Sequence, residues 1–215
     1  MNRAYIILGN LQIGLQIILW LLCFYWLDFE LFSYVFNDYI YLKGIVGIFM
    51  VSSQIFLCQY LYCVVKTDSI FKSENNTELQ NINEKHDYTT CKKCNILRPK
   101  RSHHCRYCNQ CILEMDHHCF SLNKCIGKNN YIYFLRYLVF VELNASFIFW
   151  VTSYVSINFN SELSYITLIK YGLLIFISFM GSCGLFFYLV FHVYLNLANL
   201  TTLEFMYPKL RISKK

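Results

Sequence analysis

Four long apolar stretches constrain the fold of this chain more than any other feature. They cover Ala4–Leu27, Gly44–Val65, Tyr137–Phe159 and Tyr171–Leu203, and Glu142 is the one charged residue within them. Each reaches the roughly 20 residues that an α-helix needs to cross a bilayer. Charged residues make up 15% of the chain, whereas soluble domains carry about a quarter. We therefore expect an all-α integral membrane protein with four transmembrane helices.

The distribution of Lys and Arg predicts the orientation of these helices. Of 19 such residues, twelve lie in Lys66–Arg136, four in Lys209–Lys215 and one is Arg3, while Lys43 and Lys170 alone fall in the two short loops. The positive-inside rule then places both termini and the long middle loop in the cytosol. The net charge of +6 reflects this topology and an attraction to anionic lipid, so nucleic acid is not an expected partner.

Five parts follow along the chain. Residues 1–67 hold the first two helices, and residues 68–87 form a polar cytosolic linker rich in Asn. Residues 88–134 form a cysteine-rich domain, residues 135–203 hold helices three and four, and residues 204–215 are a short cytosolic tail. The cysteine-rich domain has too few large aliphatic side chains for a core of its own, so we expect bound metal ions to stabilise it. No internal repeat is visible.

Seven cysteines and four histidines crowd into the 35 residues that begin at Cys91 and end at Cys125. Disulfides rarely persist in the cytosol, so this density indicates metal binding or catalysis. Thiolates at the spacing typical of zinc sites recur within the block: Cys91-x2-Cys94, Cys105-x2-Cys108 and Cys108-x2-Cys111. Two tetrahedral sites need eight ligands, and six cysteines with two histidines would leave one cysteine spare. Spacing alone leaves open which histidine joins which pair and whether the spare thiol is Cys111, Cys119 or Cys125.

The run Asp116-His117-His118-Cys119 contains the parts of an activated thiol nucleophile. An imidazole can take the thiol proton, and a carboxylate on its other nitrogen stabilises the imidazolium. The alternative interpretation is that all four residues only support a zinc site. Among other zinc modules, a RING-type ubiquitin ligase and a nucleic-acid zinc ribbon agree with the ligand count, but a position between transmembrane helices is typical of neither.

The cysteine-rich block carries a long spaced pattern. It reads Cys91-x2-Cys94-x3-Arg98-Pro99-x-Arg101-x-His103-His104-Cys105-x2-Cys108-x2-Cys111-x4-Asp116-His117-His118-Cys119-x5-Cys125-Ile126-Gly127-x2-Asn130-x3-Phe134. After the fourth apolar stretch follows Thr201-Thr202-Leu203-Glu204. The block resembles the cysteine-rich domain of the DHHC protein S-acyltransferases (palmitoyltransferases), and the later run resembles the TTxE motif of that family. The family's four-helix topology, with the block between helices two and three, matches as well.

The resemblance implies a set of site residues. Two structural Zn2+ ions would be held by Cys91, Cys94, His104 and Cys111, and by Cys105, Cys108, His118 and Cys125. The catalytic residues would be the nucleophile Cys119, the base His117 and its orienting carboxylate Asp116. Supporting residues would be Thr202, Asn130 and Glu204. Candidates for contact with CoA phosphates or lipid headgroups are Arg98 and Arg101.

The resemblance also implies an activity. The enzyme would transfer a long-chain acyl group, typically palmitoyl, from acyl-CoA to cysteines of substrate proteins through a Cys119 acyl-thioester. Its expected partners are acyl-CoA as co-substrate, the bilayer, membrane-associated proteins with cytosolic cysteines, and an accessory subunit. The expected location is the Golgi, the endoplasmic reticulum or another endomembrane.

Two positions depart from the family pattern. Phe120-Ser121 stands where the family has Pro-Trp, and Asp68-Ser69-Ile70 stands where it has Asp-Pro-Gly. The alternative function is therefore a catalytically weak or inactive, zinc-stabilised membrane scaffold, or a subunit of an acyltransferase complex.

Overall fold

The computed structural model describes residues 11, 14, 40–72, 88–158 and 164–210, which divide into two compact units. One unit, the cysteine-rich unit, contains residues 11, 62–72, 88–134 and 193–210. The other, the helical unit, contains residues 14, 40–61, 135–158 and 164–192.

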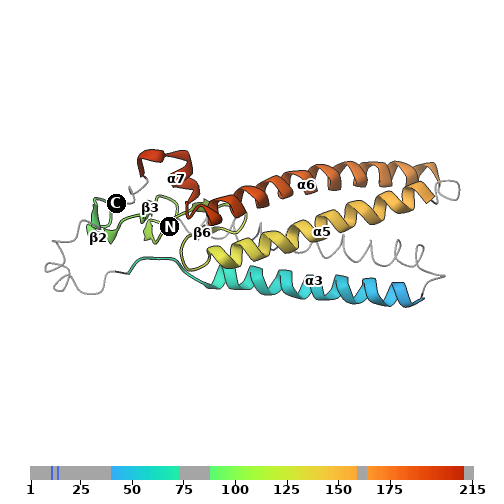
Figure 1. Ribbon diagram of the computed structural model, residues 1–215, viewed down its shortest axis with the longest axis horizontal. Coiled ribbons are helices and arrows are strands. Elements are labelled where there is room, and N and C mark those ends of the chain that lie inside the picture. Colours follow the sequence, from blue (N-terminus) through green and yellow to red (C-terminus); the bar gives the residue numbers. More distant parts are fainter. Residues whose placement is uncertain (1–10, 12–13, 15–39, 73–87, 159–163, 211–215) are drawn as a thin grey trace. The chain divides into compact units, whose positions relative to one another are not determined.

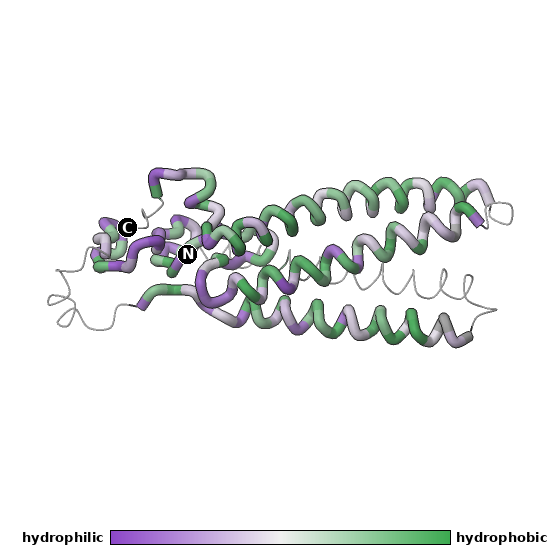
Figure 2. The backbone as a smooth tube through the Cα atoms, in the orientation of Figure 1, coloured by the Kyte–Doolittle hydropathy of each residue, from purple (hydrophilic) through white to green (hydrophobic). Residues whose placement is uncertain are grey.

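Among the described residues, three long helices are apolar enough to cross a membrane: α3 (Ile40–Lys66), α5 (Tyr131–Asn158) and α6 (Tyr165–Leu197). Hydrophobic residues dominate their length, as the colouring of Figure 2 shows. They account for three of the four expected spanning segments. The first expected segment, Ala4–Leu27, lies outside the described residues, so a total of four spanning helices stays a prediction.

Within the helical unit, polar side chains of α5 form hydrogen bonds with α3 and with α6, the helices drawn beside it in Figure 1. The Nε2 amide of Gln54 donates to the Oδ1 atom of Asn144 at 2.6 Å. Toward α6, the hydroxyl of Ser182 donates to the Oε1 atom of Glu142 at 2.9 Å, and Ser146, one turn further along α5, donates to the same oxygen at 2.7 Å. Interhelical hydrogen bonds of this kind help apolar helices to associate where lipid weakens the hydrophobic drive.

Helix α6 ends earlier than the apolar stretch that predicted it. The stretch runs to Leu203, but Asn199 adopts a left-handed conformation with φ of 52°. The N–H of Leu200 donates to the carbonyl of Leu195 at 2.9 Å, and that of Asn199 to Asn196 at 3.1 Å, which is a Schellman C-cap. A short helix, α7 (Thr202–Met206), and a single 3-10 turn, η3 (Pro208–Leu210), follow.

The cysteine-rich unit is built from three antiparallel hairpins, so the all-α expectation holds for the apolar helices and does not extend to this unit. The strands are β1 (Tyr88–Cys91) with β2 (Ile96–Pro99), β3 (His103–Cys105) with β4 (Gln110–Ile112), and β5 (His117–Cys119) with β6 (Lys124–Ile126).

The three hairpins repeat one pattern, which corrects the expectation that the chain has no internal repeat. The first strand of each hairpin ends in a cysteine, and these cysteines follow at intervals of 14 residues: Cys91, Cys105 and Cys119. Four residues after each cysteine comes an asparagine with positive φ: Asn95 (54°), Asn109 (54°) and Asn123 (47°). Asn tolerates this left-handed conformation better than most residues, so it suits the tight turn of each hairpin.

Residues at the start of the expected linker pack against the second hairpin. Ile70 forms an isolated bridge with Ile112, and the N–H of Leu113 donates to the carbonyl of Ser69 at 2.8 Å. Ile70 also packs against a small buried cluster formed by Cys105, Ile112, Met115 and Cys125. The chain leaving α3 is therefore held against the hairpins over Ser69–Ile70.

Asn130, immediately before α5, joins three segments of the cysteine-rich unit. Its Oδ1 atom accepts from the N–H of Gly127 at 2.9 Å and from the hydroxyl of Ser69 at 3.1 Å. Its Nδ2 atom donates to the carbonyls of Cys125 at 3.0 Å and of Thr67 at 3.2 Å. The fully buried side chain thus ties the end of α3 to β6 and to the start of α5.

Candidate active site and metal centres

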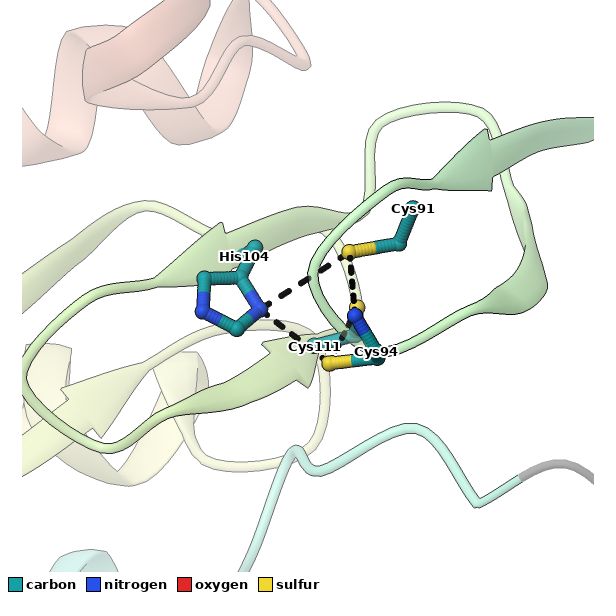
Figure 3. A group of neighbouring side chains, drawn as sticks. All are labelled: Cys91, Cys94, His104 and Cys111. Carbon is teal, nitrogen blue, oxygen red and sulfur yellow. Dashed lines mark hydrogen bonds between the residues drawn. The ribbon is translucent and has the colours of Figure 1, made fainter.

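The first metal centre draws its ligands from two successive hairpins (Figure 3). The ligand atoms of Cys91, Cys94, His104 and Cys111 lie within 4.8 Å of one another. Cys91 ends β1 and Cys94 lies in the following turn, whereas His104 and Cys111 face each other across β3 and β4. The Nδ1 atom of His104 lies 3.1 Å from the Sγ atom of Cys94 and 3.7 Å from that of Cys91.

The second metal centre repeats this arrangement 14 residues later. Cys105, Cys108, His118 and Cys125 again place their ligand atoms within 4.8 Å of one another. Cys105 and Cys108 come from the second hairpin, and His118 faces Cys125 across the third. The middle hairpin therefore contributes to both centres, which interlocks them.

The charges of the thiols fit a divalent cation. Burial alone would raise the pKa of Cys91, but the backbone N–H of Cys94 and the Cys111 side chain outweigh it and lower this pKa to about 7. Burial and the neighbouring thiols Cys91 and Cys94 raise the pKa of Cys111 to about 12. Repulsion between the negative charges of neighbouring thiolates therefore opposes ionisation of Cys111. A Zn2+ ion, which prefers sulfur and imidazole ligands in a tetrahedron, removes this repulsion, so both clusters could hold zinc.

Cys119 belongs to neither cluster. In the first two hairpins a second cysteine follows three residues after the first, as Cys94 and Cys108. In the third hairpin the same position holds Leu122, which is buried with 4% of its surface exposed. The turn of the third hairpin therefore carries Cys119 alone, where the first two turns carry a Cys-x2-Cys pair. The 14-residue repeat is the sequence signal that singles out Cys119 without reference to any family.

Alternation along β5 separates two adjacent histidines. Successive side chains of a strand point to opposite faces, so His117 and Cys119 share one face while His118 points to the other, toward its zinc cluster. The Nδ1 atom of His117 lies 2.7 Å from the Oδ2 atom of Asp116, whose side chain is 1% exposed. The His117 ring also meets the buried ring of Phe134 edge to face, at 5.3 Å between centroids.

These contacts set the pKa values of Asp116 and His117. Burial disfavours the charged imidazolium of His117, but hydrogen bonds and charges of Asp116 and Cys119 outweigh burial and raise the pKa of His117 to about 9. Burial would raise the pKa of Asp116, yet His117 and the N–H of Thr202 hold it below its usual value. The arrangement therefore pairs a carboxylate with an imidazole that readily accepts a proton.

Helix α7 supplies the remaining support of Asp116. The N–H and the hydroxyl of Thr202 donate to the two oxygens of Asp116, each at 2.7 Å. Thr201 and Glu204 form a capping box at the start of this helix. The three residues that were predicted to support the site, Thr202, Asn130 and Glu204, thus all lie in the cysteine-rich unit and make specific contacts there.

The two arginines assigned to CoA or headgroup contact have different surroundings. Arg98 has buried Nε and Nη1 atoms without a hydrogen-bond partner among the described residues, and the same holds for Ser102 Oγ and His103 Nε2. Burial, followed by the charge of Arg98, lowers the pKa of His103. The side chain of Arg101, in contrast, is engaged by Glu204, Glu114 and Asn199.

An aromatic group surrounds the position where the family has Pro-Trp. The rings of Phe120, Tyr107 and the zinc-cluster residue His118 lie 4.8 to 5.0 Å apart between centroids. The guanidinium of Arg106 stacks over Tyr107 at 4.8 Å. Phe120, which follows Cys119 in the sequence, is 57% exposed, and its ring packs against Tyr107 and His118.

Two residues of this region stand in the motifs quoted from the sequence but received no role there. Ser69 and Gly127 complete the bonds of Asn130, and a Cβ atom at Gly127 would lie 2.5 Å from the carbonyl oxygen of Leu113. The close approach of two backbone segments therefore requires glycine. The spacing of the motif includes Gly127 but does not reveal this role, because its neighbours Leu113, Ile112 and Ser69 come from other segments of the chain.

Comparison with known proteins agrees with this geometry. A family model described as DHHC palmitoyltransferase matches residues 84–209, which is more than half of the chain. No curated protein matches the chain significantly. The matched region contains both cysteine-histidine clusters, Cys119 and α7, and the chain belongs to the DHHC palmitoyltransferase family.

Proposed function

We propose that this protein is a membrane-bound S-acyltransferase that carries acyl groups on Cys119. The arrangement of Asp116, His117 and Cys119 supports this most directly, because a buried carboxylate and an imidazole on the face of the free thiol can activate it. Family membership supports the same reaction. The three apolar helices support action at a membrane, where an acyl chain gains about 0.8 kcal/mol for each buried CH2.

The proposed reaction exchanges one thioester for another twice. His117 takes the proton of the Cys119 thiol, and the sulfur attacks the carbonyl carbon of a long-chain acyl-CoA. The bond between carbonyl and CoA sulfur breaks, and the proton passes to the departing CoA thiolate. In the second exchange, His117 takes the proton of a substrate protein's thiol, whose sulfur attacks the carbonyl carbon of acyl-Cys119. The bond between this carbonyl and the Cys119 sulfur breaks, and the proton passes to the departing Cys119 thiolate. The two Zn2+ ions would keep the hairpins folded, and neither proton step requires them.

Arg98 is our candidate for contact with a phosphate of CoA. Its buried Nε and Nη1 atoms have no partner among the described residues, and a buried guanidinium without acceptors is costly. The neighbouring Ser102 and His103 also carry buried polar atoms without such partners. A phosphate oxygen would satisfy these groups by charge-assisted hydrogen bonds.

Autoacylation tests the proposal. Purified protein in detergent is incubated with labelled palmitoyl-CoA, and hydroxylamine-sensitive label and zinc content are both measured. We expect label on the wild type and on the control Cys58→Ser, but none on Cys119→Ser, with zinc near two per chain throughout. Label that persists on Cys119→Ser would refute the nucleophile, and absence of label on the folded wild type would favour the scaffold alternative.

A further inference from the structure

Arg101 connects the segment before Asp116 with helix α7. Its Nε and Nη2 atoms donate to the two carboxylate oxygens of Glu204, at 2.6 and 2.9 Å. Its carbonyl oxygen accepts from the N–H of Met115 at 3.2 Å. The residue thus holds both the chain that leads into Asp116 and the helix that donates to it.

Every guanidinium N–H of Arg101 meets a protein acceptor. Besides the two bonds to Glu204, Nη1 donates to Glu114 at 3.2 Å and to Asn199 Oδ1 at 3.4 Å, while Nη2 donates to the carbonyl of Asn199 at 3.1 Å. Arginine has five such donors in a fixed planar fork. None is left for a CoA phosphate or a lipid headgroup, so the geometry favours an internal role.

Glu204 transmits this contact to α7. Its Oε2 atom accepts from the N–H of Thr201 at 2.9 Å, and its own N–H donates to Thr201 Oγ1 at 3.2 Å. Burial disfavours the carboxylate of Glu204, but Arg101 outweighs burial and lowers its pKa. The bidentate ion pair therefore holds a charged carboxylate in the capping box, and the box sets where Thr202 begins the helix.

We propose that Arg101 is a positioning residue for the thiol centre. It fixes Glu204, the capping box fixes Thr202, and Thr202 holds the Asp116 carboxylate in the orientation that His117 requires. That Arg101 contributes to acyl transfer rests on the proposed function. That Arg101 affects the reactivity of the Cys119 sulfur can be measured without acyl-CoA.

The test measures two quantities on Arg101→Gln, on Glu204→Gln and on the control Lys128→Gln. Lys128 pairs with Glu114 as Arg101 does, but 60% of its side chain is exposed. One quantity is the rate at which iodoacetamide alkylates Cys119, read by peptide mass spectrometry. The other is the dependence of autoacylation on palmitoyl-CoA concentration. Zinc content is measured for every variant.

We expect both Arg101→Gln and Glu204→Gln to slow Cys119 alkylation and maximal autoacylation about ten-fold, a coupling typical of residues in one network. The KM for palmitoyl-CoA and the zinc content should stay unchanged, as should all values for Lys128→Gln. A rise in KM with an unchanged maximal rate would instead make Arg101 a ligand contact and overturn the proposal. Loss of zinc from both variants would overturn it too, because Arg101 would then serve folding alone.

A double-mutant cycle separates positioning from a general structural effect. If Arg101 acts through Thr202, then Arg101→Gln should add little to the loss already caused by Thr202→Val. Independent, multiplicative losses would contradict the relay. Should the wild type form no acyl-enzyme, the proposed function fails, but the alkylation rates still decide whether Arg101 positions the thiol centre.

Discussion

Cys119 occupies in the third hairpin the position that Cys105 occupies in the second. Each ends the first strand of its hairpin, and each faces the residue five positions later: Gln110 across from Cys105, and Lys124 across from Cys119. Cys105 has Cys108 as its partner thiol, whereas Cys119 has Leu122 at that place. The nucleophile we propose is therefore a zinc-knuckle cysteine whose partner is missing.

Leu122→Cys should restore the missing partner. The variant would place a second thiol three residues after Cys119, with His117 on the same hairpin, and three protein ligands suffice for a zinc ion that keeps a water. We expect zinc content to rise above two per chain and acyl label on Cys119 to fall several-fold. Leu122→Ser is the matched control, because it removes the same leucine without adding a thiolate. Equal label on the two variants would contradict the interpretation.

Much of the helical architecture follows from the sequence, but its ends do not. An apolar run of sufficient length predicts α3, α5 and α6 because lipid accepts only a backbone that satisfies its own hydrogen bonds. The run that predicts α6 continues to Leu203 because residues 198–203 carry no charge. The helix ends at Leu197 because Asn199 adopts a left-handed backbone conformation and Thr201 is the N-cap of α7. Neither feature alters the hydropathy of the sequence, so hydropathy could not predict the end of the helix.

The two clusters that could hold metal ions were predictable, while the hairpins that carry them were not. The family pattern gave the same eight residues that the structure brings together. Strands of three or four residues are too short for an alternating pattern to stand out, so the cysteine-rich block showed no strand signal. The role of Arg101 was equally hidden, because its partner Glu204 lies 103 residues away in the sequence.

Loss of one zinc ligand should weaken both metal centres. Cys91→Ser removes a ligand of the first centre, and the second hairpin serves both centres, so disorder in one is transmitted to the other. We expect the variant to lose at least one of two zinc ions and most acyl label, because metal binding supplies much of the free energy that folds such domains. The zinc content per chain is measured after gel filtration, and the label by autoacylation. Full retention of the second zinc with undiminished label would show that the centres are independent.

Gly127→Ala should destabilise the cysteine-rich unit. The added Cβ would lie 2.5 Å from the carbonyl oxygen of Leu113 and 2.9 Å from Ile112 Cγ2. Backbone must shift to relieve such a contact, and overpacking of this kind typically costs about 1–3 kcal/mol. The melting temperature of the zinc-loaded protein should fall accordingly. Gly184→Ala is the control, because its Cβ meets nothing within 4 Å, and an equal fall in both variants would contradict the account.

Arg98→Gln should raise the KM for palmitoyl-CoA without changing the reactivity of the Cys119 thiol. The buried Nε and Nη1 atoms of Arg98 have no acceptor among the described residues. We expect this KM to rise by roughly ten- to hundred-fold, because one charge-assisted hydrogen bond is worth about 1.5–3 kcal/mol. Alkylation of Cys119 by iodoacetamide should not change. An unchanged KM would remove Arg98 from the CoA site.

The pH dependence of autoacylation should report the pair formed by Asp116 and His117. Because the pKa of His117 is raised to about 9, its imidazole stays protonated at neutral pH, and the neutral base appears only as the pH rises through about 9. The rate of label incorporation should therefore increase from about pH 6 upward and level off once the pH has passed this pKa.

Asp116→Asn should move this profile to lower pH, because removal of the carboxylate lets the pKa of His117 fall toward its ordinary value. The maximal rate should also fall, by roughly 10²–10⁴-fold, the range that a positioned acid or base contributes. Single-turnover labelling between about pH 6 and 10 measures both effects, with Cys58→Ser as a control that should follow the wild-type curve. If the midpoint of Asp116→Asn coincides with that of the wild type, Asp116 does not govern the protonation of His117, and the thiol of Cys119 must be activated by another group.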